Sequence, residues 1–362
     1  PNIAGRLEGL AVPNTVVISA VTAQLVQRAF ALEGDGLQAP KGITETMGVW
    51  RVVSPLETLR ETALPAPEDV KPLVGRSEEL GLLLRRWEQS KAGQGQAVLI
   101  SGEAGIGKSR LVRALIEQLA ETPFTCLEYR CSPYHQHTAL YPAVDLLQRS
   151  LRFDSTTSTD EKMTRLETLL HEHRLDLQEH LPLLASLLSL SPPAGRYPPL
   201  KMSPQQQRQR TLDMLLALTL AHAKQQSVLF IVEDLHWIDP STLEWLGLLI
   251  DQGPTARILT LMTCRPTFQA PWSGRAHVTS LTINRLLPRQ VAQMARAIDG
   301  ADVLPVDLLD QIVTQTDGVP LFVEEDTKFV LASQQLQGRA EEAAAPALSA
   351  ITIPMTLHDL LM

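Results

Sequence analysis

The sequence predicts an α/β fold whose core is a parallel β-sheet covered by helices. Three short apolar runs, at residues 97–100, 228–232 and 257–263, have the length and composition of buried strands, and a fourth strand is expected near residues 276–281. Stretches with leucines at helical spacing separate these runs. Strands that alternate with helices are typical of parallel sheets, so the fold class is α/β, followed by a helical region at residues 288–337.

The composition fits a globular chain of several domains. The 362 residues are 44% hydrophobic and 20% charged, with a formal charge of −8. Domains usually hold about 100–200 residues, so two or three units are expected. The negative charge argues against a nucleic-acid partner or an anionic membrane surface, and no apolar run is long enough to span a bilayer. Three cysteines are too few for a disulfide framework, so we expect a reducing, cytoplasmic location.

A glycine-rich loop follows the strand at residues 97–100. Residues 102–109 read GEAGIGKS and match the phosphate-loop pattern G-x-x-x-x-G-K-[ST] without a mismatch. The pattern needs glycines because successive backbone N–H groups must turn toward phosphate oxygens, and the following helix directs its positive end at the same charge. The glycines that we assign to the nucleotide are Gly102, Gly105 and Gly107.

The end of the loop supplies side chains for Mg-ATP. We expect Lys108 to reach the β- and γ-phosphates and the Ser109 hydroxyl to bind Mg²⁺. Arg110, the next residue of the predicted helix, is also assigned to the nucleotide. The predicted ligands are therefore ATP or ADP with Mg²⁺.

Two further strands end in charged residues. Glu233 and Asp234 follow the strand at residues 228–232; one carboxylate is expected to hold Mg²⁺ and the other to activate the attacking water. Glutamate precedes aspartate here, which leaves the two roles unassigned. Arg265 follows the strand at residues 257–263, at the sheet edge where ligands bind, and is expected to sense the γ-phosphate unless it is a plain surface arginine.

Proline content and periodicity divide the chain into five segments. Residues 1–53 contain strand-like runs at 15–19 and 48–53 around a helical stretch at 20–30, and the proline-bearing residues 54–71 form a linker. An ATPase core is expected at residues 72–282 and a helical domain at residues 283–345, with the start of a further domain at residues 346–362. The chain opens at Pro1 without a methionine, so we expect a fragment of a longer protein.

These motifs together resemble STAND-class signalling ATPases, which carry an Orc-like AAA module. The matching residues are 73–76, 102–109, 230–239, 263–266 and 317–322. The resemblance implies that Val74 and Gly75 lie near the adenine and that Pro320 packs on the nucleotide. It also implies that residues 353–357 open a winged-helix domain.

The N-terminal segment resembles the end of a class III adenylate or guanylate cyclase domain. Residues 2–7 match the pattern N-x-x-x-R-L, and this domain order is familiar in bacterial cyclases. The resemblance implies that Asn2 orients the substrate and that Arg6 stabilises the transition-state phosphate. The metal-binding aspartates of such a domain would precede Pro1, so this chain by itself is expected not to cyclise ATP.

The expected function is a slowly hydrolysing regulatory ATPase module of a cyclase-linked signalling protein. Its partners would be the nucleotide and the cyclase and C-terminal sensor regions of its own longer chain, and a homo-oligomer is compatible with this class. The alternatives are the ATPase region of a large ATP-dependent transcription activator and an ADP-bound scaffold without turnover. A zinc site at Cys126, Cys131, His135 and His137 is also weighed against a plain loop, because the spacing is not that of a zinc finger.

Overall fold

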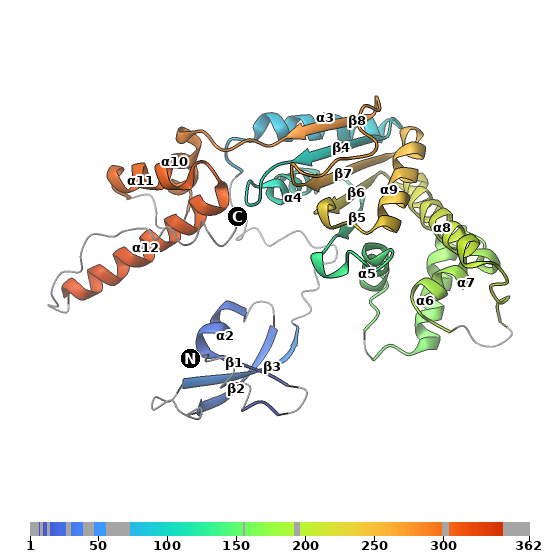
Figure 1. Ribbon diagram of the computed structural model, residues 1–362, viewed down its shortest axis with the longest axis horizontal. Helices are drawn as coiled ribbons and strands as arrows, with labels where there is room; N and C mark the ends of the chain where they lie inside the picture. Colours follow the sequence, from blue (N-terminus) through green and yellow to red (C-terminus); the bar gives the residue numbers. More distant parts are fainter. Residues whose placement is uncertain are drawn as a thin grey trace. The chain divides into compact units, whose positions relative to one another are not determined.

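The chain divides into two compact units, residues 1–65 and 66–362 (Figure 1). The computed structural model describes residues 7, 10–12, 15–26, 30–38, 47–55, 73–154, 156–191, 196–298 and 304–342. Within these ranges, none of the helices combines the length and apolar character needed to cross a bilayer.

The N-terminal unit is a three-stranded antiparallel sheet with one helix. Its elements are β1 (Val16–Ser19), α2 (Ala20–Val26), β2 (Phe30–Gln38) and β3 (Met47–Pro55), and the strand order is β1-β3-β2. The strands predicted at residues 15–19 and 48–53 are present, but the helix predicted up to residue 30 is too long, because Phe30 already pairs with β3. Strand β2 was not predicted because its sequence contains glycine and aspartate, which are rare in strands. Here they lie at a bulge near Gly34 and Gly36.

The second unit contains five parallel strands, which confirms the predicted fold class. They are β4 (Gln96–Ser101), β5 (Thr125–Arg130), β6 (Val228–Glu233), β7 (Ile258–Cys264) and β8 (Val278–Thr282), in the order β5-β6-β7-β4-β8 (Figure 1). Because β4, β6 and β7 are parallel neighbours in the sheet, their carboxyl ends meet at one edge. This arrangement brings together three motifs that are far apart in the sequence.

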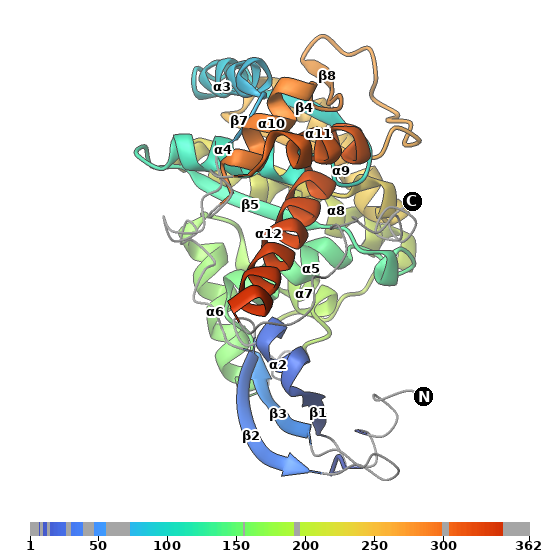
Figure 2. The same cartoon turned by 90° about the vertical axis from the view of Figure 1, so that its left-hand side faces the viewer.

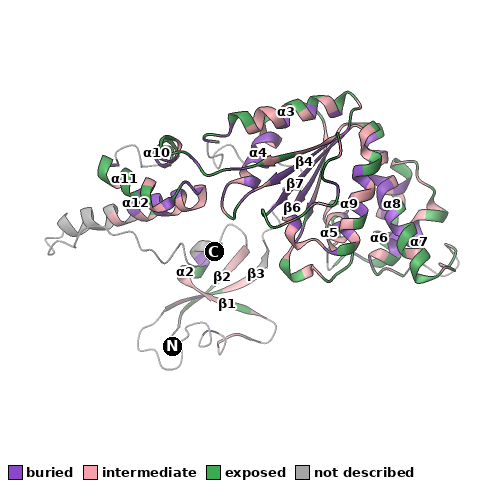
Figure 3. Cartoon of the chain, turned by 45° about the horizontal axis from the view of Figure 1, so that its top comes forward, coloured by how far each residue is buried: buried purple, intermediate pink, exposed green. Residues whose placement is uncertain are grey.

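Alternate residues of the strands face two separate layers of helices. On β6, Leu229 and Ile231 belong to a core that includes α3 (Ser77–Lys91) and α4 (Lys108–Leu119). Phe230 and Val232 belong to the opposite core. That core is completed by α5 (Tyr141–Ser150), α6 (Thr159–Glu172), α7 (Leu177–Leu187), α8 (Pro204–Gln225) and α9 (Pro240–Gln252), as the burial pattern of Figure 3 shows.

Helix ends differ in how their backbone groups are capped. Asp239 caps α9, accepting hydrogen bonds from the backbone N–H groups of Ser241 and Thr242 at 3.0 Å, with Pro240 at the first position. Helix α3 begins at Ser77, and Arg76 occupies the cap position without a side-chain cap bond.

A small helical group follows the sheet, as the periodicity of residues 288–337 predicted. It contains α10 (Pro288–Arg296), α11 (Val306–Thr316) and α12 (Pro320–Glu342), which pack on one another around a core that includes Val291, Ile312 and Val323 (Figure 2). Residues 343–362, which include the expected winged-helix segment, lie outside the described residues.

Candidate nucleotide-binding site

The phosphate loop connects β4 to α4 and adopts a backbone that only glycine accepts easily. Gly105 and Gly107 have φ values of 71° and 97°. A Cβ atom added at Gly105 would lie 2.8 Å from the Cβ atom of Leu321. The loop therefore needs glycine for its conformation and, at Gly105, for the close approach of α12.

Lys108 begins α4 and is held against the loop. Its side chain is buried, and Nζ donates hydrogen bonds to the carbonyl oxygens of Gly102 and Glu103 at 2.9 and 2.8 Å. Burial lowers the pKa of Lys108, whereas the charge of Asp234 opposes this shift. The lysine is thus positioned at the mouth of the loop by the loop's own backbone.

The carboxyl groups of the neighbouring residues Glu233 and Asp234 lie in different surroundings. Glu233 ends β6; burial raises the pKa of its carboxyl group, and the nearby Ser109 hydroxyl opposes the rise. Asp234 has a left-handed backbone with φ of 58°, and its N–H donates to Oγ1 of Thr263 at 3.0 Å. This turn separates the carboxylates, so that Glu233 lies by Ser109 while Asp234 lines a cavity.

That cavity, of about 440 Å³, collects most of the residues selected from the sequence. Those that line it are Val74, Gly105, Gly107, Lys108, Ser109, Arg110, Asp234, Arg265 and Pro320. Gly75 is directly bonded in the chain to the lining residues Val74 and Arg76; it has φ of 69° and approaches Gln290. Gly102 is not a lining residue, and its N–H donates to the Cys264 carbonyl. Asn2 and Arg6 lie outside the described residues.

Arg265 and Arg110 differ in how they are held. Arg265 is exposed and lies over the ring of Trp237, with 5.6 Å between Cζ and the ring centroid. This contact keeps its guanidinium at the cavity rather than free in solvent. Arg110 forms an ion pair with Glu117 at 3.2 Å, along the same helix.

Several residues that line the cavity were not selected as site residues from the sequence. His236 and Trp237 follow the acidic pair in a short 3₁₀ turn, Leu235–Trp237, and both ring nitrogens of His236 are buried without a hydrogen-bond partner among the described residues. Others lie before α3 and in the region of the helical group: Leu73, Arg76, Leu286, Met294, Leu321 and Glu324. Leu73, Arg76 and Leu321, like His236 and Trp237, lie in the sequence stretches that carried the family resemblance. The wall residues Leu286, Met294 and Glu324 lie outside those stretches and have no fixed spacing from the phosphate loop, so no signal in the sequence pointed to them.

The helical group contacts the phosphate loop directly. The Leu321 N–H donates to the Gly105 carbonyl at 3.2 Å, one residue after Pro320 begins α12. Arg285 forms ion pairs with both Glu103 of the loop and Asp317, which precedes α12. Loop conformation and the position of α12 are therefore physically linked.

The expected zinc alternative finds no support. In the described part of the chain, which includes Cys126, Cys131, His135 and His137, no group of three or more histidine, cysteine or acidic residues is arranged to hold a metal ion.

Comparison with known proteins places this site in a family. An uncharacterized protein of Rhizobium meliloti (strain 1021) is 27% identical over 349 residues; the match covers 95% of this chain and 33% of that protein, so the chain spans about a third of its length. Three solved structures are similar at low identity. They are Drosophila ORC bound to DNA (TM-score 0.45, 13% identity, 83% of this chain and 62% of that one), the Pyrococcus horikoshii STAND protein with a tetratricopeptide repeat sensor (0.40, 15%, 81% and 33%), and Aeropyrum pernix ORC1 in complex with DNA (0.46, 10%, 79% and 65%).

A family profile is more decisive than these likenesses. The profile of the AAA ATPase domain matches residues 72–261, which is more than half of the chain and includes the phosphate loop and the acidic pair. This chain belongs to the AAA ATPase domain family.

Proposed function

We propose that this chain is a regulatory ATPase module that binds Mg-ATP, hydrolyses it slowly, and changes the contacts of its helical group with the state of the nucleotide. The observation that carries the proposal is the cavity of about 440 Å³ at which the phosphate loop, Asp234, Arg265 and the first turn of α12 meet. Nucleotide binding is the general property that membership of the AAA ATPase domain family implies.

The residues present fit a nucleoside triphosphate. The positive-φ glycines and the start of α4 offer backbone N–H groups to phosphate oxygens, and Lys108 adds a positive charge beside them. Apolar side chains from Val74 and Leu286 offer a surface for the base at the same cavity. The Ser109 and Glu233 oxygens are the hard ligands that Mg²⁺ prefers.

We assign different roles to the two carboxylates. Glu233, beside Ser109, would hold Mg²⁺, which when bound neutralises charge that develops on the phosphates. Asp234 faces the cavity, where it would orient the attacking water. Arg265, held by Trp237, would contact the γ-phosphate.

The switch would use the contacts between loop and helical group. Leu321 bonds to Gly105, and Arg285 bridges Glu103 and Asp317, so a shift of the loop on loss of the γ-phosphate would be passed to α12. Two-state repacking of this kind is a common means of signalling.

Phosphate release by the purified chain tests the proposal. We expect Lys108→Ala to lower the rate on the order of 100-fold, because a charge that stabilises the transferring phosphate is lost. The matched control is Lys91→Ala, an exposed lysine that is paired with Glu88 on α3 and should leave the rate unchanged. Equal rates for the wild type and Lys108→Ala would contradict turnover at this site, and ADP binding without any phosphate release would favour the scaffold alternative.

A second pair of variants separates the carboxylates. Asp234→Asn should abolish turnover with Mg-ATP affinity nearly kept, whereas Glu233→Gln should raise the Mg²⁺ concentration needed for binding. The reverse pattern would exchange the two assignments.

We also propose that residues 1–53 derive from a nucleotidyl cyclase domain. Two described strands, β1 and β3, lie on the strand-like runs predicted at residues 15–19 and 48–53 of this segment. In a longer parent chain, Arg6→Ala should remove cyclic AMP formation; an unchanged rate would contradict the assignment and would instead favour the transcription-activator alternative.

A further inference from the structure

A second cavity, of about 520 Å³, lies among β5, β6, α5, α6 and α8. It shares no lining residue with the nucleotide cavity. Its volume is within the range of about 300–1,000 Å³ that small-molecule sites occupy. Seven of its sixteen lining residues are leucines, contributed by β5 and by all three helices and the residue that follows α5.

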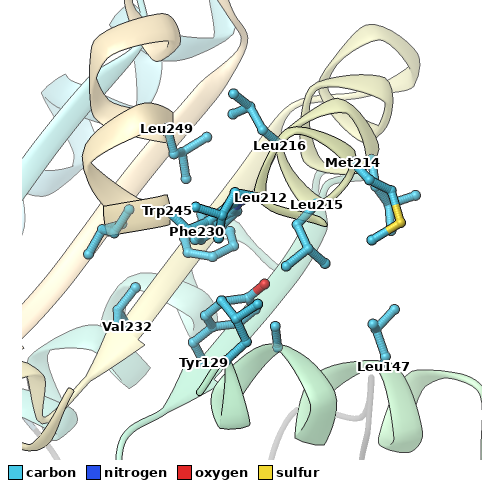
Figure 4. Close-up of a cluster of buried hydrophobic side chains, with 14 of the residues drawn as sticks. Tyr129, Leu147, Leu212, Met214, Leu215, Leu216, Phe230, Val232, Trp245 and Leu249 are labelled. Carbon is cyan, nitrogen blue, oxygen red and sulfur yellow. The ribbon is translucent and has the colours of Figure 1, made fainter. Parts of the chain in front are cut away.

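One wall of this cavity carries the hydroxyl group of Tyr129, which has no hydrogen-bond partner among the described residues. Tyr129 of β5 is 3% exposed, and its ring packs on Phe230 and Trp245 with centroids 4.8 and 5.2 Å away. The hydroxyl oxygen points toward Leu215, another lining residue (Figure 4), and accepts or donates no hydrogen bond among the described residues. Burial raises the pKa of Tyr129, so the group remains a proton donor. An occupant with an oxygen atom at this point would accept a hydrogen bond from the Tyr129 hydroxyl in a wall that is otherwise largely apolar.

The other hydroxyl groups of the wall are already satisfied. Ser150, Thr168 and Thr219 each donate to a carbonyl of their own helix, at 3.3, 2.9 and 2.9 Å. Among the hydroxyl groups of the wall, Tyr129 therefore offers the donor that is left to bind an oxygen acceptor.

The rim of the cavity has a basic end and an acidic end. Arg165 donates to the carbonyls of Leu151 and Arg152, which fixes the chain after α5. Arg152 itself is exposed and forms no ion pair with any described residue. Glu172 lies seven residues after Arg165 on α6, which is about 10 Å along the helix. An anionic group on an occupant would consequently be attracted to the Arg152 end and kept from the Glu172 end.

We propose that this cavity binds an amphipathic carboxylate, with its apolar body among the leucines, an oxygen acceptor at the Tyr129 hydroxyl and its carboxylate at Arg152. Each part of this molecule matches one feature of the cavity: the apolar body matches the leucine wall, the oxygen acceptor matches the Tyr129 hydroxyl, and the carboxylate matches the Arg152 guanidinium. The inference does not depend on ATP turnover, because none of these residues lines the nucleotide cavity.

Calorimetric titration with three matched compounds tests the proposal. The compounds are ω-hydroxydecanoate, decanoate, which lacks the inner oxygen, and decanediol, which lacks the carboxylate. The wild type should bind ω-hydroxydecanoate about tenfold more tightly than either of the others, as expected for one hydrogen bond or one exposed ionic contact.

Variants assign each preference to a residue. Tyr129→Phe keeps the ring and should erase the difference between ω-hydroxydecanoate and decanoate, while the fully exposed control Tyr134→Phe should not. Arg152→Gln should weaken both carboxylates and leave decanediol unchanged; its control is Arg174→Gln, another exposed arginine with positive φ.

A blocking variant checks the location. Leu218→Trp fills the cavity and should abolish binding, whereas Lys108→Ala should bind all three compounds as the wild type does. Circular dichroism should show that each variant is folded. The proposal is overturned if the wild type binds none of the compounds, if binding survives Leu218→Trp in the folded protein, or if Tyr129→Phe keeps the preference for the inner oxygen.

Discussion

The nucleotide cavity and the leucine-lined cavity border the same strand, β6, on which Phe230 lies at the second cavity and Glu233 ends beside the first. The nucleotide cavity depends on a continuous loop whose glycines and lysine act through backbone groups and charge. The leucine-lined cavity depends on side chains between residues 127 and 230, brought together only by packing. A substitution in the phosphate loop can remove ligand binding while the fold survives. A substitution in the packed wall of the leucine-lined cavity also lowers the stability of the hydrophobic core.

The largest effect is expected at the core beneath the leucine-lined cavity. Trp245 of α9 is fully buried and stacks on Tyr129, so Trp245→Ala should lower the free energy of unfolding by about 3–5 kcal/mol. Urea unfolding followed by circular dichroism measures this. Trp237→Ala, at the partly exposed wall of the nucleotide cavity, should cost less than about 1 kcal/mol and weaken ADP binding instead. Similar stability losses for the two variants would remove the contrast.

A smaller effect, confined to ligand binding, is expected in the phosphate loop. Gly105→Ala places a methyl group against Leu321 at a positive φ and should weaken ADP binding on the order of 100-fold with a modest change in unfolding. Gly93→Ala is the matched control: its φ is 83°, but nothing lies within 4 Å of the added atom. Equal affinities for the two variants in an ADP titration would show that the contact with α12 is unimportant.

The smallest effect is a pH dependence to which His222, in the wall of the leucine-lined cavity, contributes. Burial and the neighbouring His173 lower the pKa of His222 from 6.5 to about 4. Between these values the unfolded chain binds more protons than the folded one, so the free energy of unfolding should fall as the pH is lowered from about 6.5 toward 4. His222→Gln should flatten this part of the stability profile, and the exposed His171→Gln should not. A profile that is the same in all three proteins would contradict the assignment.

Much of the sheet could be predicted because buried parallel strands are continuous apolar runs. The strands near residues 97–100, 228–232 and 257–263 were found in this way. Strand β2 was not, since the glycines and aspartate at its bulge resemble a turn.

The residues of the candidate site also fall into two groups, those that could be predicted from the sequence and those that could not. Lys108, Ser109 and the glycines of the loop were readable because phosphate binding needs those residues at fixed spacing within one turn. The wall residues Leu286, Met294 and Glu324 were not, because they come from separate elements and have no fixed spacing from the loop.

By itself, the sequence determined the α/β class, the phosphate loop and the charged residues at the strand ends, because period, glycine content and side-chain chemistry are local properties. Only the tertiary structure decided the strand order, the separation of Glu233 from Asp234, and the contact of α12 with the loop. It alone also revealed the cavity around Tyr129. These features arise from packing between segments distant in the chain, and such packing leaves no spacing along the sequence.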